Sequence, residues 1–290
     1  MKLPFKALII ASSFLLVSQV PIFLNGNFSG SDLILAESNE FENRPASFSV
    51  DPILDQKFYF LAKGHQAFVF VSQDKQYVLK LLKLHYPQVH LPGVSFRFSP
   101  IPFANTFYRI FFKQELQKQA RRDFKSYLNA IDKFKEESLV SYIHLTESFD
   151  LKKNIQCYDK TGILHSFPAD KTCFLIQKNV PSLESTLHFL IEENKIDDAK
   201  VILKNLIDLI HLRKKLGFHE PTNKFHANFG CVGLRPVQYD IGKLLTKEDL
   251  QIDSQDEKFK DISIYKLRKW IKKDFPSLID YLDELQKDCE

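Results

Sequence analysis

The sequence predicts an α+β protein with two lobes: a five-stranded antiparallel sheet with one long helix, then a short helical lobe, preceded by an N-terminal hydrophobic helix. Three observations lead to this prediction. Short β-prone runs fill residues 58–82 and return at 139–149 and 171–178. Beyond residue 181 the apolar residues recur with a helical period. Residues 7–24 are almost continuously apolar.

The composition is that of a folded globular chain. The chain has 290 residues, of which 44% are hydrophobic, so it can bury a sizeable core. Its 40 basic and 36 acidic residues leave a formal net charge of only +4 and are interspersed along the chain. The charge pattern therefore predicts no nucleic-acid partner, and it leaves a protein partner or acceptor open.

Residues 1–24 are predicted to be a signal peptide or a membrane anchor. Two lysines precede an apolar run that is just long enough to span a bilayer. A cleaved signal peptide and a retained anchor both fit, with a slight preference for the anchor, and a buried N-terminal helix is the alternative. Acidic residues follow the run with no lysine before Lys57, so the positive-inside rule places the domain on the non-cytoplasmic side. The sequence thus predicts a membrane-anchored or exported protein.

The rest of the chain is predicted to form a linker and two lobes. Residues 25–50 are rich in Asn, Ser, Gly and Glu, which is typical of a linker. The N-lobe is expected over residues 51–180 and the helical C-lobe over residues 181–290. Within the N-lobe, three antiparallel strands are predicted at 58–61, 67–71 and 77–82.

A long helix is predicted at roughly 107–135, with a buried stripe. The stripe consists of Phe124, Tyr127, Leu128 and Ile131. Strands at 139–149 and 171–178 would complete the five-stranded sheet, with residues 150–170 as an excursion between them. Residues 85–101 show no helical period and are predicted to be an inserted loop.

Four short segments carry recognisable chemistry. Residues 61–69 keep the register of the pattern G-x-G-x-x-G-x-V, with only the middle glycine, Gly64, present. Residues 77–80 match V-A-I-K and end in Lys80. Residues 174–180 form an apolar strand that leads into the helical part. Residues 239–242, Tyr-Asp-Ile-Gly, look like D-F-G. Taken singly, these segments also fit an ordinary hairpin, a surface lysine and a core strand.

In this order the segments resemble the protein-kinase superfamily and, more narrowly, kinase-like proteins of chlamydia-related bacteria. The resemblance covers roughly residues 58–244. It implies that Gly64 and Lys80 contact the phosphates of ATP. It also implies a carboxylate partner for Lys80 on the long helix, with Asp123 as the first candidate and Glu115 as the second. Both carboxylates could equally be solvated helix charges.

The resemblance also implies a magnesium site and a damaged catalytic loop. Asn228 and Asp240 stand where the two Mg²⁺ ligands are expected. The catalytic aspartate belongs five residues before that asparagine, but the residue there is Asn223, whose amide cannot accept the substrate proton. Glu220 is the only nearby carboxylate and is a weak candidate for a displaced base, since a surface glutamate before a proline describes it as well.

Two other groups of residues contain potential metal ligands or a potential disulfide. The residues His219, His226 and Cys231 match no standard zinc spacing. If the domain is exported, Cys157 and Cys173 could close a disulfide across the excursion.

Two functions follow from the resemblance. The first is a pseudokinase, a membrane-anchored or secreted module that binds a protein or a nucleotide, and the incomplete glycine loop and the lost aspartate favour it. The alternative is an active phosphotransferase that uses ATP and Mg²⁺ with a non-standard catalytic loop, because phosphoryl transfer depends mostly on positioning and charge neutralisation. Both readings expect Lys80, Asn228 and Asp240 to converge on one cleft.

Overall fold

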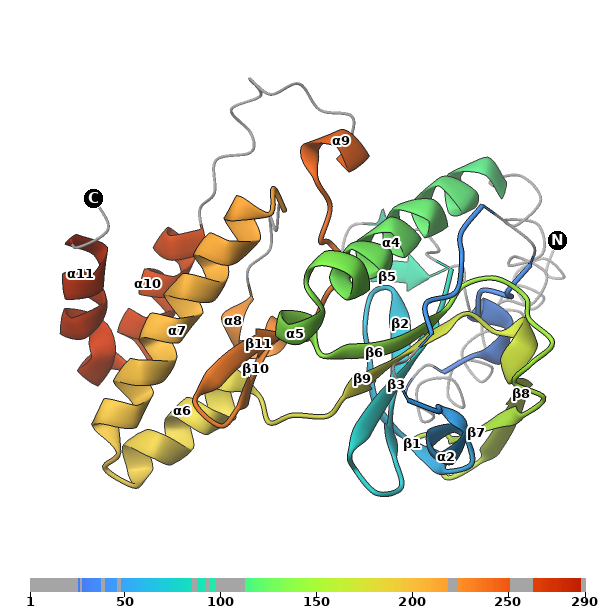
Figure 1. Cartoon of the computed structure of the whole chain (residues 1–290), viewed down its shortest axis with the longest axis horizontal. Coiled ribbons are helices and arrows are strands. Elements are labelled where there is room, and N and C mark those ends of the chain that lie inside the picture. The colour runs from blue at the N-terminus through green and yellow to red at the C-terminus, as the bar shows by residue number, and fades with distance from the viewer. Residues whose placement is uncertain are drawn as a thin grey trace, which may run out of the picture. The chain divides into compact units, whose positions relative to one another are not determined.

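The computed structural model describes residues 26, 28–37, 40–45, 48–84, 88–91, 94–97, 113–218, 224–250 and 263–287. The chain divides into two compact units (Figure 1). Unit 1 comprises Met1–Arg121 and His144–Ile176, and unit 2 comprises Arg122–Ile143 and Gln177–Glu290. The bounds predicted for the linker and the two lobes stay predictions.

A seven-stranded mixed sheet is the main β structure (Figure 1), in the order β6-β9-β3-β2-β1-β7-β8. Its strands are β1 (Lys57–Lys63), β2 (Ala67–Ser72), β3 (Tyr77–Leu82), β6 (Val140–His144), β7 (Asn154–Tyr158), β8 (Leu164–Pro168) and β9 (Phe174–Lys178). Strand β2 pairs with β1 and β3 in antiparallel register, whereas β1 and β7 run parallel. The prediction of a five-stranded antiparallel N-lobe is therefore wrong.

The two additional strands come from residues 150–170, which were predicted to be an excursion. They form the antiparallel hairpin β7–β8, and its turn is held by Asp159. The Asp159 carboxylate accepts hydrogen bonds from the amides of Thr161 and Ile163 and from Nε2 of His165. Burial alone would raise the pKa of Asp159, but hydrogen bonds from Thr161, His165 and the main chain lower it. The parallel pairing with β1 joins residues about 100 positions apart, and no local pattern predicts that pairing.

Residues 28–37 pack against the sheet of unit 1. The ring of Phe28 makes edge-on contacts with the rings of Phe68, Phe70 and His165. The main chain of the same segment bonds to two parts of the unit: the amide of Ile34 donates to Leu82, and the amide of Ala36 donates to Lys171. These residues therefore form part of the folded unit.

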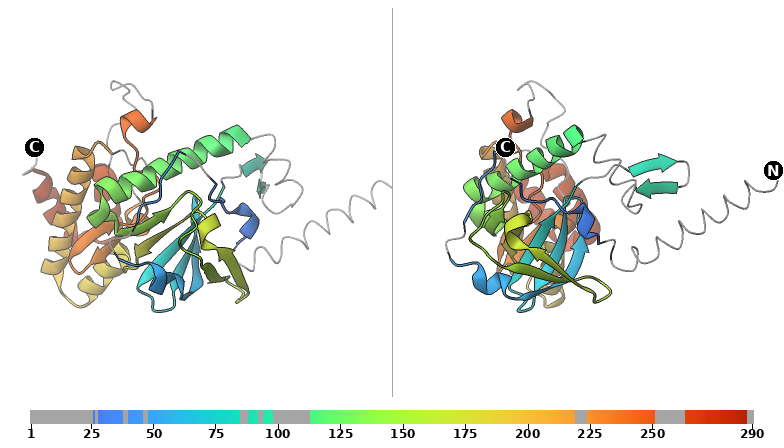
Figure 2. Two further views of the ribbon diagram at one scale, coloured as in Figure 1. Left: turned by 45° about the vertical axis from the view of Figure 1, so that its right-hand side comes forward. Right: turned by 90° about the vertical axis from the view of Figure 1, so that its right-hand side faces the viewer.

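The remaining elements of unit 1 are short. They are η1 (Gly30–Asp32), α2 (Asp51–Leu54), η2 (Ala169–Lys171), the strands β4 (Gln88–Leu91) and β5 (Val94–Arg97), and residues 113–121 at the start of α4 (Lys113–Lys133). Strands β4 and β5 pair with each other in a separate two-stranded sheet (Figure 2). They lie within residues 85–101, which were predicted to be a loop.

Unit 2 is mainly helical. It contains most of β6 and the C-terminal part of α4. Its other elements are α5 (Lys135–Ser138), α6 (Leu183–Glu192), α7 (Ile196–Lys215), α8 (Phe225–Asn228), the hairpin of β10 (Phe229–Val232) and β11 (Arg235–Gln238), α9 (Lys247–Leu250), α10 (Ser263–Asp274), η4 (Pro276–Leu278) and α11 (Ile279–Lys287). Helix α7 packs against α6, α11 and β11. It ends at Lys215, and Gly217 shortly after it has a φ of 76°, which suits a residue without a Cβ atom.

The expectation of a membrane-anchored protein on the non-cytoplasmic side is corrected. Within the part of the chain that the structure describes, no helix is both long enough and apolar enough to cross a bilayer. Residues 7–24, on which the predicted hydrophobic helix rests, lie outside the described residues.

The expected disulfide is also absent from the described residues. Cys157 and Cys173 are free, buried thiols. Burial raises the pKa of both thiols far above the usual value, so neither is a reactive thiolate at neutral pH.

Candidate functional site

The hairpin β10–β11 brings Asn228 and the Asp240 segment together in unit 2. Its first pair, Phe229 and Gln238, lies at the open end, so the residues that flank the hairpin are neighbours. The carbonyl oxygen of Asn228 accepts hydrogen bonds from the amides of Tyr239 at 3.0 Å and of Asp240 at 3.2 Å. Asn228 is buried, whereas Asp240 is exposed. The main chains of the two predicted Mg²⁺ ligands, Asn228 and Asp240, are therefore neighbours within unit 2.

Helix α4 holds the residues that follow Asp240. The hydroxyl of Ser126 donates to the carbonyl of Ile241 at 2.5 Å and accepts from the amide of Leu244 at 2.6 Å. The side-chain amide of Asn129 donates to the carbonyl of Leu244 at 3.0 Å. Residues 241–244, which follow Asp240, are thus held at both ends by hydrogen bonds to side chains of helix α4.

The carboxylates of Asp123 and Asp240 both act electrostatically on the phenol of Tyr127. Burial raises the pKa of Tyr127 well above its usual value, and the negative charges of Asp123 and Asp240 raise it further. Asp123 is only 3% exposed, one helical turn before Tyr127. The helix carboxylate and the carboxylate after β11 therefore act on the same buried group, and Tyr127 stays neutral at physiological pH.

Two glutamine side chains complete the support of this segment. Nε2 of Gln177 donates to the carbonyl oxygens of Ser138 and, at 3.1 Å, of Tyr239. Nε2 of Gln238 donates to the carbonyl of Asp240 at 3.1 Å, and its Oε1 accepts from buried Arg213 at 3.2 Å. Such a connected network restricts the positions that Asp240 can adopt.

The arrangement offers ligand types that suit Mg²⁺. An asparagine oxygen and an aspartate carboxylate are hard oxygen donors, and Mg²⁺ usually takes only one or two protein carboxylates beside phosphate and water. Among the described residues, no group of three or more His, Cys, Asp and Glu side chains could hold a metal ion alone.

The remaining predicted nucleotide contacts belong to unit 1. Lys80 is half-buried on β3, opposite Val69 of β2. Gly64 is exposed at the turn between β1 and β2, and its amide donates to the carbonyl of Ala67 at 2.9 Å. Glu115 is exposed near the start of α4. The partner of Lys80, and its convergence with Asn228 and Asp240, stay predictions.

The residues of the predicted catalytic loop are outside the described residues. They include Glu220, Asn223 and also His219. Of the three residues weighed as a zinc site, the structure describes only His226, which is exposed, and Cys231, which is buried.

Sequence reasoning missed the residues that support Asp240. Tyr127 was assigned to the core stripe only, and Ser126, Asn129 and Gln177 were not considered. A serine next to a buried stripe position is a weak signal, because serine in a helix usually faces solvent or bonds to its own helix. The contacts of Ser126 with residues 115 and 118 positions away have no local signature.

Comparison of the chain with protein-family models, with curated proteins and with solved structures gave no match.

Proposed function

We propose that the chain is a kinase-like domain with an impaired catalytic loop that works as a protein-binding or nucleotide-binding module. One observation supports the proposal: the main-chain carbonyl of Asn228 bonds to the main-chain amides of Tyr239 and Asp240, so the main chains of Asn228 and Asp240 are neighbours. The order of the sequence motifs, from Gly64 through Lys80 to Asp240, supports the same proposal.

The missing aspartate makes a binding role the better choice. A kinase base accepts the proton of the substrate hydroxyl, and the residue at that position here is Asn223. A carboxamide is neither a base nor a proton carrier at physiological pH. The phosphate loop also keeps only one of its three glycines. The lost aspartate weakens catalysis, and the lost glycines reduce contact with a nucleotide phosphate.

An active ATP-dependent and Mg²⁺-dependent phosphotransferase is the second candidate. The adjacency of Asn228 and Asp240 favours it, because metal positioning is a large part of phosphoryl-transfer catalysis. In that case Glu220, or positioning of the acceptor alone, replaces the usual base.

Thermal unfolding of the full chain with ATP and Mg²⁺ tests the proposal. A ligand at about 100 times its dissociation constant stabilises the fold by about 2.7 kcal/mol. We expect Lys80→Ala and Asp240→Ala each to remove the shift. The exposed residues Lys160 and Asp208 supply the matched controls Lys160→Ala and Asp208→Ala, which should keep it.

The outcomes separate the two candidates. No shift for the wild-type chain would exclude nucleotide binding and leave protein binding alone. Transfer of labelled phosphate to an acceptor, lost in Asp240→Ala, would favour the phosphotransferase instead. A shift that survives both Lys80→Ala and Asp240→Ala would contradict the kinase-like site.

A further inference from the structure

Asp240 is an exposed residue whose main chain is held from both sides. Its amide donates to the carbonyl oxygen of Asn228 at 3.2 Å, and its carbonyl oxygen accepts from Nε2 of Gln238 at 3.1 Å. Gln238 is completely buried, whereas Asp240 is exposed. Buried support of this kind beneath a surface carboxylate is typical of a group that has to meet a ligand in a fixed position. The orientation of Gln238 therefore bears directly on the candidate site.

Arg213 on helix α7 sets the orientation of the Gln238 amide. Nη1 of Arg213 donates to Oε1 of Gln238 at 3.2 Å. A guanidinium group only donates hydrogen bonds, and a main-chain carbonyl only accepts them. The side-chain oxygen of Gln238 must therefore face Arg213, and its NH2 group must face the carbonyl of Asp240. The opposite orientation would put two donors together at Arg213 and two acceptors together at Asp240.

Arg213 is itself held by helix α10. Its Nη2 donates to the hydroxyl of Ser263, the first residue of α10, at 2.8 Å. Arg213 is only 2% exposed and Ser263 is fully buried, so water hardly competes for this hydrogen bond. Arg213 also lies in the last turn of α7, where the helix dipole favours a positive charge. The guanidinium group is thus fixed between acceptors from two different elements, β11 and α10.

We propose that Arg213 is a positioning residue for Asp240 and that it acts through the side chain of Gln238. Because Ser263 holds Arg213, the start of α10 takes part in the same support. For the identity of the ligand, the inference rests on the proposed function. With Mg²⁺ and a nucleotide bound, the carboxylate of Asp240 would meet the cation without first having to be ordered, and such preorganisation strengthens binding.

The variant Gln238→Glu separates positioning from packing. Glutamate has the same size and keeps an oxygen for Arg213, but it puts a second oxygen in place of the NH2 group that supports Asp240. Amide hydrogen exchange of the full chain without ligand, followed at Tyr239 and Asp240, measures the effect. We expect both amides to exchange about tenfold faster than in the wild-type chain, because the loss of one hydrogen bond changes a local opening equilibrium by about that factor. Amides in the middle of α7 should keep their rates.

Arg213→Met should accelerate exchange at the same two amides, because methionine cannot orient the Gln238 side chain. Arg268→Met is the matched control. It removes the ion pair of Arg268 with Asp283, at 2.7 and 2.8 Å in the same unit, and should leave both amides unchanged. If urea unfolding shows that Arg213→Met does not fold, Gln238→Glu decides alone. Unchanged exchange of both amides in Gln238→Glu would overturn the proposal, and so would an equal acceleration in Arg268→Met.

Nucleotide titrations give a readout that a change in packing alone would not move. We expect Gln238→Glu to raise the Kd for ATP with Mg²⁺ about tenfold, and to leave the Kd for ATP with EDTA unchanged. An equal change in both dissociation constants would contradict a role of Arg213 and Gln238 at Asp240. A wild-type chain that binds no ATP would overturn the proposed nucleotide site, and the exchange rates of Tyr239 and Asp240 would still decide the role of Arg213.

Discussion

Ser126 on helix α4 and Leu244 in the segment after Asp240 are joined by a hydrogen bond of 2.6 Å from the Leu244 amide to the Ser126 hydroxyl. The same hydroxyl donates to the carbonyl of Ile241 at 2.5 Å. Both partners are buried, so this side chain satisfies two main-chain groups that water does not reach.

Replacing Ser126 with alanine should destabilise unit 2. The variant leaves a buried amide and a buried carbonyl without their partner, which costs about 1–3 kcal/mol for each unsatisfied group. Urea unfolding at neutral pH measures the change. Ser166→Ala, at an exposed serine, is the control and should change stability by no more than about 0.5 kcal/mol. Equal stability of Ser126→Ala and the wild-type chain would show that the hydroxyl does not anchor residues 241–244.

Sequence patterns predicted three neighbouring strands of this protein well. The strands at 58–61, 67–71 and 77–82 correspond to β1, β2 and β3, which pair in antiparallel register as predicted. These strands are short β-prone runs, and the polar residues 72–76 separate the second from the third. That pattern was sufficient to predict all three strands. The stripe of α4 was also predicted from its helical period: Phe124, Tyr127 and Ile131 are buried, and Leu128 is half-buried.

The non-local pairings were not predictable in the same way. Residues 154–158 and 164–168 contain β-prone residues, but their place beside β1 depends on a parallel pairing with a strand far away in sequence. The support of Asp240 by Ser126 and Gln177 depends equally on distant contacts. The spacing of apolar residues predicts which face of a helix or strand is buried, but it does not predict which other element packs against that face.

Gly230 should tolerate no side chain. A Cβ atom added there would lie 2.6 Å from the carbonyl oxygen of Pro181 and 2.7 Å from Cγ2 of Val180, so the main chain would have to move. We expect Gly230→Ala to destabilise the protein by about 1–3 kcal/mol, as overpacked sites do.

Gly64→Ala is the matched control for Gly230→Ala. The nearest atom to an added Cβ is the carbonyl oxygen of Ala67 at 3.4 Å, so stability should hardly change. If the proposed phosphate loop is correct, Gly64→Ala should still reduce the thermal shift with ATP and Mg²⁺, because backbone approach to phosphate becomes narrower. Thermal unfolding with and without nucleotide measures both effects. A destabilised Gly64→Ala with a normal Gly230→Ala would contradict this account of the two positions.

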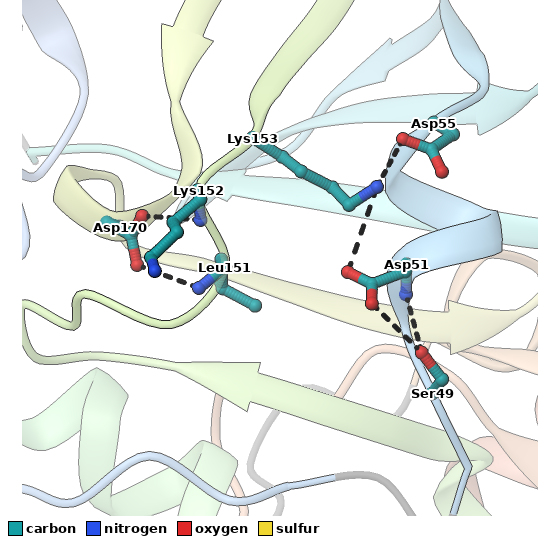
Figure 3. A network of polar contacts seen from close by, with 7 residues as sticks. All are labelled: Ser49, Asp51, Asp55, Leu151, Lys152, Lys153 and Asp170. Atoms are coloured by element: carbon teal, nitrogen blue, oxygen red, sulfur yellow. Dashed lines mark hydrogen bonds and ion pairs between the residues drawn. The ribbon is translucent and has the colours of Figure 1, made fainter.

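Asp170 should stabilise unit 1 above acidic pH. Figure 3 shows its carboxylate accepting hydrogen bonds from the amides of Leu151 and Lys152, at 3.2 and 2.8 Å. The hydroxyl of Ser148 donates to it at 2.5 Å. Burial would raise the pKa of Asp170, but these hydrogen bonds lower it below the usual value.

A lowered folded-state pKa means that the unfolded chain takes up the proton first. The contribution of Asp170 is therefore complete above its unfolded pKa of about 3.9 and is lost as the pH falls through the folded-state value. Asp170→Asn should lower the free energy of unfolding at pH 7 by about 1–3 kcal/mol. As the pH falls below about 4, the variant should lose less of its remaining stability than the wild-type chain loses. Urea unfolding at several pH values measures both effects, and an unchanged acid limb would contradict the assignment.

His144 should make the protein less stable as the pH falls below neutrality. Its Nδ1 lies 2.9 Å from the carbonyl oxygen of Thr172, which can only accept, so Nδ1 carries the proton of the neutral ring. Its Nε2 lies 2.9 Å from the Ser148 hydroxyl. Burial lowers the pKa of His144, although the Thr172 carbonyl and the charges of Asp170 and Asp150 act in the opposite direction.

With a folded-state pKa below the unfolded value of about 6.5, the unfolded chain binds a proton that the folded chain excludes. Stability is then complete above about pH 6.5 and falls below it, by at most about 1.4 kcal/mol per pH unit, until the folded-state pKa is reached. His144→Gln has no titrating ring and should lose this slope between about pH 6.5 and pH 5, whereas His226→Gln at an exposed site should keep it. Urea unfolding across this range measures the slope. If His144→Gln retains the wild-type slope, the pH dependence has another origin, because no other change separates the two proteins.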